Sequence, residues 1–111
     1  MTSRGEAVFS YGTLQDPAVQ QACFGRRLPG DADAIAGYRQ SAIAVAEPDR
    51  AGTRSYPILD PSSDASDLIA GMVLLLTEAE LAQADEYEGP DYRRVWVRTR
   101  AGRDAWVYIR A

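Results

Sequence analysis

Histidine is absent from this 111-residue chain, and cysteine occurs only once, as Cys23. Without histidine, a single chain cannot form a Ser-His-Asp or Cys-His catalytic arrangement or a histidine-ligated metal site. One cysteine also allows no intrachain disulfide and no Cys-x-x-Cys motif. Any catalysis must therefore use carboxylates, tyrosines, hydroxyls, arginines, Cys23 or backbone amides.

Long apolar runs and an excess of basic residues are missing as well. No apolar stretch approaches the length of a membrane span, and residues 1–6 lack the apolar region of a signal peptide. The net charge is −4, from 16 acidic and 12 basic residues. This balance disfavours binding to nucleic acids or anionic membranes. We expect a cytoplasmic protein that binds neither.

The remaining composition is that of an ordinary soluble protein, with 46% apolar and 25% charged residues. The length fits one domain with its own core. We therefore expect a single domain over residues 1–111.

Two helices are predicted from their end signals. Asp16 and Pro17 suit the N-cap and first position of a short helix that Gly25 ends. Thr77 and Glu80 have the spacing of a capping box, and the helix that they begin is expected to end near residue 86.

Strands are predicted where apolar residues alternate with polar ones or run together. They are expected at residues 6–11, 33–45, 56–59, 68–76, 93–99 and 105–110. Residues 33–45 should form one strand bent at Gly37, and residues 68–76 a strand buried on both faces. This order favours a mixed or antiparallel sheet curled toward a barrel, although alternation alone does not decide closure.

One candidate site is the loop Tyr11-Gly12-Thr13-Leu14, between the first strand and the first helix. A glycine at such a turn lets the backbone approach a ligand, and amides near a helix start suit a carboxylate or an oxyanion. The simpler interpretation is a strand-to-helix turn that needs a glycine.

The other candidate is the segment from Asp85 to Tyr92, with four carboxylates in seven positions. Crowding and burial raise the pKa of a carboxyl and make it a better base at neutral pH. The alternative is a solvated helix end whose acids pair with Arg93 and Arg94.

Other reactive or aromatic side chains are more typical of structural roles. Cys23 is typical of a small core residue, and the remaining aromatic side chains are typical of residues that pack in the core. Arg39, Arg94 and Arg98 read as surface ion-pair partners, and one of them could hold a substrate carboxylate.

Taken in order, these segments resemble the γ-glutamylcyclotransferase and AIG2-like family. The resemblance covers nearly the whole chain. It rests on Val8 to Leu14, Gly37-Tyr38, Tyr56 to Leu59, Gly71, Asp85 to Gly89, Tyr92 to Arg94, and Ala105 to Tyr108.

The resemblance implies an α+β fold, a small mixed β-barrel with two short flanking helices. It implies release of an amine from a γ-glutamyl compound with formation of 5-oxoproline, without metal or cofactor. The family's catalytic glutamate falls on Glu88, the substrate-binding loop on Tyr11, Gly12, Thr13 and Leu14, and a pocket tyrosine on Tyr92.

Three functions are compatible with these observations. The first is a cyclotransferase for a γ-glutamyl amine, peptide or amino acid, with Glu88 as general acid and base. The second is a module of the same fold that binds a small ligand without cyclising it, and the third is an interaction domain. We also expect the polar loop at residues 47–55 to cover the pocket.

Overall fold

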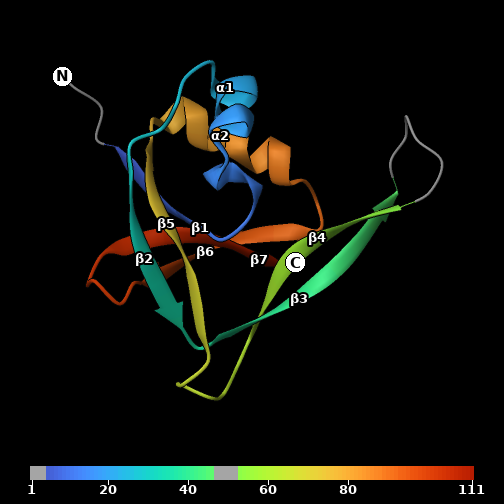
Figure 1. The fold of residues 1–111 in the computed structure, drawn as a ribbon, viewed down its shortest axis with the longest axis vertical. Helices are drawn as coiled ribbons and strands as arrows, with labels where there is room; N and C mark the ends of the chain where they lie inside the picture. The colour runs from blue at the N-terminus through green and yellow to red at the C-terminus, as the bar shows by residue number, and fades with distance from the viewer. Residues whose placement is uncertain (1–4, 47–52) are drawn as a thin grey trace.

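A computed structural model describes residues 5–46 and 53–111 of the chain. Its elements, in chain order, are β1 (Glu6–Ser10), a 3-10 turn η1 (Thr13–Gln15), α1 (Pro17–Phe24), β2 (Gly30–Ala36), β3 (Tyr38–Ala46), β4 (Thr53–Pro61), β5 (Leu68–Leu76), α2 (Glu78–Glu88), β6 (Tyr92–Arg98) and β7 (Asp104–Arg110). Five strands form one sheet in the order β2-β5-β1-β7-β6, and β3 and β4 form a separate two-stranded sheet. Figure 1 shows this second sheet extending away from the first.

The mixed character of the main sheet comes from β1, which runs antiparallel to β5 and parallel to β7. Both helices lie on one side of the sheet (Figure 1). Successive residues of β1 point to opposite faces. Val8 therefore joins the apolar cluster that includes Leu81 and Ala84 of α2, whereas Phe9 joins a second cluster with Leu59 of β4. The predicted α+β class is confirmed.

The predicted barrel is not closed, because the main sheet keeps two edges, β2 and β6. The turn between β6 and β7 approaches β2 without forming a ladder. There, Arg100 N donates to Ala34 O at 2.8 Å and Ala101 N donates to the Asp33 carboxylate at 3.1 Å. Strands β3 and β4 pair with each other instead of joining this sheet, so they do not bridge its two edges.

The single strand expected over residues 33–45 is wrong, because the chain changes sheets at Gly37. Gly37 has φ of +83°, a left-handed conformation that favours glycine. Residues before it pair with β5, and residues after it pair with β4. Residues on both sides of Gly37 are rich in Ala, Ile and Val, so the composition of the segment does not reveal the change of partner.

The expected burial of residues 68–76 on both faces is also only partly correct. Leu68 and Leu75 remain 51% and 47% exposed, while Val73 and Leu74 are buried. Ile69 and Leu76, near the two ends of β5, are buried as well. In the middle of β5, a Cβ atom added to Gly71 would lie 2.2 Å from Ser10 O. Gly71 therefore lets the end of β1 approach β5 closely.

The helix end signals are confirmed. The Asp16 side chain accepts from Ala18 N at 2.9 Å, and Gly25 ends α1 in a left-handed conformation. Thr77 and Glu80 form the predicted capping box of α2, and the bidentate partner Arg26 helps to lower the pKa of Glu80 to about 2. Helix α2 continues two residues past the predicted end and finishes at Glu88. Within the described residues, no helix is long and apolar enough to cross a membrane.

Candidate active site

A cavity of about 220 Å³ lies between the loop after β1 and the end of α2. Its lining includes all six residues singled out from the sequence, so the structure brings both candidate segments into one site. The lining residues are Val8, Phe9, Ser10, Tyr11, Gly12, Thr13, Leu14, Tyr56, Pro57, Tyr87, Glu88, Asp91, Tyr92 and Tyr108. Residues 47–52, most of the loop expected to cover this cavity, lie outside the described residues.

The loop wall of the cavity is a 3-10 turn rather than an open loop. Gln15 N donates to Gly12 O at 3.2 Å, and Asp16 N donates to Thr13 O at 2.9 Å. At the first positions of such a turn, backbone N–H groups have no partner within the turn. Thr13 and Leu14 occupy these positions and line the cavity, so their amides have no partner within the turn.

Leu14 fixes this turn in place. Its side chain is only 1% exposed. Its carbonyl accepts a 2.8 Å hydrogen bond from Gln20, whose other side-chain atom accepts from Leu28 N at 2.8 Å. The buried amide of Gln20 thus joins the loop to α1 and to the segment before β2. Sequence reasoning missed Gln20, since a glutamine on a short helix gives no sign of burial.

Glu88 forms the opposite wall as the last residue of α2. Burial raises the pKa of the Glu88 carboxyl from its ordinary 4.5 to about 7. The chain can turn away directly after Glu88 because Gly89 follows with φ of +78°. Glu88 therefore exchanges a proton readily near neutral pH.

The tyrosine hydroxyls around Glu88 donate to protein acceptors. Tyr11 donates to Tyr108 O at 2.6 Å, Tyr92 to Pro57 O at 2.8 Å, and Tyr108 to the Asp85 carboxylate at 2.7 Å. Burial, with a smaller contribution from Glu88, raises the pKa of Tyr92 to about 12. Burial also raises the pKa of Tyr11 and Tyr108 above the ordinary range. These phenols stay neutral and line the site mainly with their rings.

The opening of the cavity carries a polar contact between its two walls. The hydroxyls of Thr13 and Tyr87 lie 2.7 Å apart and share a hydrogen bond. Both side chains are exposed, and Tyr87 retains 43% of its accessible surface. The contact joins the loop to the last turn of α2 beside Glu88.

The predicted arginine partners are confirmed as ion pairs. Arg39 pairs with Asp67 at 3.8 Å, Arg94 with Asp85 at 3.0 Å, and Arg98 with Asp104 at 3.3 Å. None of these arginines is among the described residues that line the cavity. Backbone amides are therefore better placed than these arginines to receive a carboxylate.

Sequence reasoning missed the lining residues Pro57 and Tyr108 as parts of the site, whereas Asp91 lies in the candidate segment from Asp85 to Tyr92. It also assigned Tyr56 and Tyr108 to packing, although both line the cavity. One sequence signal could have identified Tyr108 as a site residue. It lies in the predicted last strand, within the segment Ala105 to Tyr108 that carries part of the family resemblance. Its pairing opposite Arg94, and hence its place beside Glu88, requires the register of β6 and β7.

A family model described as gamma-glutamyl cyclotransferase, AIG2-like, matches residues 8–111. No curated protein sequence matches the chain. The solution structure of an Arabidopsis thaliana protein is 25% identical, with a TM-score of 0.76 over 99% of this chain and 66% of that one. A second Arabidopsis thaliana structure is 24% identical, with a TM-score of 0.75 over 99% of this chain and 71% of that one.

A solved gamma-glutamyl cyclotransferase is 15% identical, with a TM-score of 0.73 over 96% of this chain and 67% of that one. At this identity, the likeness shows the shared fold alone. The chain spans about two thirds of the length of these structural neighbours.

Proposed function

Because the chain belongs to the gamma-glutamyl cyclotransferase, AIG2-like family, we propose that it cyclises a γ-glutamyl amine, peptide or amino acid. The products are 5-oxoproline and the free amine, and Glu88 is the general acid and base. The proposal rests on the environment of Glu88. The Glu88 carboxyl is partly buried, with a pKa of about 7, and lies across a cavity from the loop that carries the Thr13 and Leu14 amides.

The proposed reaction needs one proton carrier, since the substrate contains its own nucleophile. The α-ammonium group of the substrate first loses one proton to solvent. Ionised Glu88 then removes a second proton from the α-nitrogen as this nitrogen attacks the γ-carbonyl carbon and closes a five-membered ring. The bond from that carbon to the leaving nitrogen then breaks, while protonated Glu88 returns the proton to the departing amine. Folding the substrate inside the cavity supplies proximity between the reacting atoms.

The loop opposite Glu88 is proposed to hold the negative charge of the substrate. The amides of Thr13 and Leu14 suit either the α-carboxylate or the oxyanion that forms on the γ-carbonyl. Tyr11 and Tyr92 are proposed to contact the substrate through their rings, because their hydroxyls donate elsewhere.

The reaction class is tested by measuring 5-oxoproline release from γ-glutamyl amino acids, glutathione and γ-glutamyl-ε-lysine. Release from any of these compounds supports the cyclotransferase and identifies its leaving group. If the folded protein releases none, its melting temperature should be measured with each compound. A saturable increase would then favour a module that binds without cyclising.

Gly12→Val tests whether the loop contacts the substrate. A Cβ atom at Gly12 would lie 3.5 Å from Pro57 Cγ, an ordinary contact. The φ of −123° is also open to residues other than glycine. We therefore expect a folded variant in which the valine obstructs the loop amides and raises KM at least about tenfold. Gly12→Ala should give a smaller increase, and an unchanged KM in both variants would contradict substrate contact with the loop.

A further inference from the structure

The Asp85 carboxylate lies outside the cavity, where α2, β6 and β7 meet. It accepts two hydrogen bonds from Arg94, from Nε at 3.0 Å and from Nη2 at 3.1 Å. It accepts a third from the Tyr108 hydroxyl at 2.7 Å. One carboxylate thus joins the helix that carries Glu88 to two neighbouring strands.

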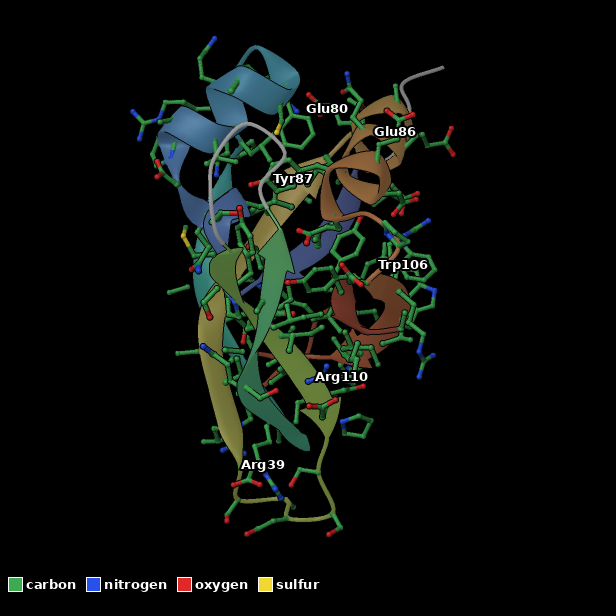
Figure 2. All side chains as sticks on the ribbon, turned by 90° about the vertical axis from the view of Figure 1, so that its right-hand side faces the viewer. Arg39, Glu80, Glu86, Tyr87, Trp106 and Arg110 are labelled. Atoms are coloured by element: carbon green, nitrogen blue, oxygen red, sulfur yellow. The ribbon has the colours of Figure 1, made fainter. Side chains whose placement is uncertain are left out.

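Aromatic stacking restricts the movement of Arg94. Its guanidinium lies 4.2 Å from the centre of the Trp106 ring, which stacks on Trp96 with 4.1 Å between ring centres. The Trp106 indole also donates to Glu6 at 3.2 Å. In Figure 2, Trp106 is labelled below Glu86 and Tyr87 of α2. Exposed ion pairs usually contribute little to stability, but a bidentate arginine held over an aromatic ring is a rigid anchor.

This anchor is connected to both walls of the cavity. Asp85 lies one helical turn before Glu88, and its carbonyl accepts from Gly89 N at 3.1 Å where α2 ends. The Tyr108 ring lines the cavity, and its carbonyl accepts from the Tyr11 hydroxyl at 2.6 Å. Contacts of Asp85 and Tyr108 therefore link the last turn of α2 to Tyr11, the first residue of the loop after β1.

We propose that Asp85 and Arg94 are positioning residues that hold the last turn of α2 against Tyr108 and so keep Glu88 in its partly buried position. Neither residue lines the cavity. They act on the site through the helix end and the tyrosine ring. The proposal uses the assignment of Glu88 as the base, but the position of Glu88 can be tested without any substrate.

Removing the anchor should admit water to Glu88. Its raised pKa comes from burial, so greater exposure lowers that pKa toward 4.5. Other titratable groups facing the carboxyl are Tyr11 beside β1, Cys23 on α1, Tyr56 on β4, Tyr87 on α2, Asp91 before β6, Tyr92 on β6 and Tyr108 on β7.

Arg94→Gln separates positioning from simple electrostatics. Loss of a nearby positive charge alone would raise the pKa of Glu88, whereas loss of the anchor lowers it through exposure. We expect a lower pKa, measured from the carboxyl carbon chemical shift of Glu88 by NMR. Tyr108→Phe, which changes no charge and keeps the ring, should lower it by a smaller amount.

Arg110→Gln is the matched control. Arg110 makes a bidentate pair with Asp60 at 2.7 and 3.2 Å, with side-chain exposure of 43% and 39%. That pair joins β7 to β4 and does not contact α2. Its loss should leave the pKa of Glu88 at the wild-type value. An unchanged or higher pKa in Arg94→Gln, with Tyr108→Phe also at the wild-type value, would overturn the proposal.

Kinetics provide a second readout if the wild type releases 5-oxoproline. Arg94→Gln should lower kcat about tenfold with little change in KM, since small displacements of a catalytic group affect mainly the chemical step. A lower melting temperature with unchanged kcat and unchanged Glu88 pKa would show that the anchor only stabilises the fold. Absence of activity in the wild type would count against the proposed function, while the NMR result would still decide the positioning role.

Discussion

Glu88→Gln is expected to reduce kcat for 5-oxoproline release about 100- to 10,000-fold, the usual contribution of a general acid or base. Glutamine keeps the size and polarity of the side chain but carries no exchangeable acidic proton. In the wild type, kcat/KM should rise with pH up to about 7, as the partly buried Glu88 carboxyl ionises. The variant should lose this dependence. Initial rates over a range of pH measure both effects.

Glu86→Gln is the control for this experiment. It removes an exposed carboxylate from the same helix without altering the cavity lining. Its kcat should equal that of the wild type. If Glu88→Gln is folded and keeps more than about a tenth of the wild-type kcat, Glu88 is not the proton carrier. Asp91, the other carboxylate among the described lining residues, would then be the next candidate.

Local signals in the sequence were sufficient to predict both helices. Asp16, Pro17 and Gly25 act within one short segment, and so do Thr77 and Glu80, so their hydrogen bonds need no knowledge of the rest of the fold. The family resemblance contributed the joint assignment of the loop and Glu88. Burial of Glu88 could not be read from its segment, since neighbouring acidic residues on α2 remain exposed.

Strand partners were harder to predict because they depend on residues far apart in the chain. The residues on either side of Gly37 have the Ala-, Ile- and Val-rich composition expected of one strand, yet the chain pairs with β5 before Gly37 and with β4 after it. The open sheet has the same cause, since alternation identifies strands but not which strands meet. Tyr108, Gln20 and Asp85 acquire their roles from long-range contacts of this kind.

The raised pKa of Glu88 also predicts that the proposed catalytic residue destabilises the protein at high pH. An unfolded glutamate ionises near pH 4.5, but the partly buried Glu88 keeps its proton up to about pH 7. Between these values the folded state binds more protons than the unfolded state, so stability falls as pH rises. The wild type should lose about 2–3 kcal/mol of unfolding free energy through Glu88 from about pH 5 to about pH 8.

Glu88→Gln isolates this contribution because the other titrating groups are common to both proteins. Urea unfolding should give similar stabilities near about pH 5, where glutamine resembles the protonated acid, and a more stable variant near about pH 8. Glu86→Gln should instead follow the pH dependence of the wild type. A constant difference between Glu88→Gln and the wild type at all pH values would mean that Glu88 is solvated in the folded state. The same substitution should therefore remove activity and increase stability above neutral pH, as expected when a fold buries a carboxyl for catalysis.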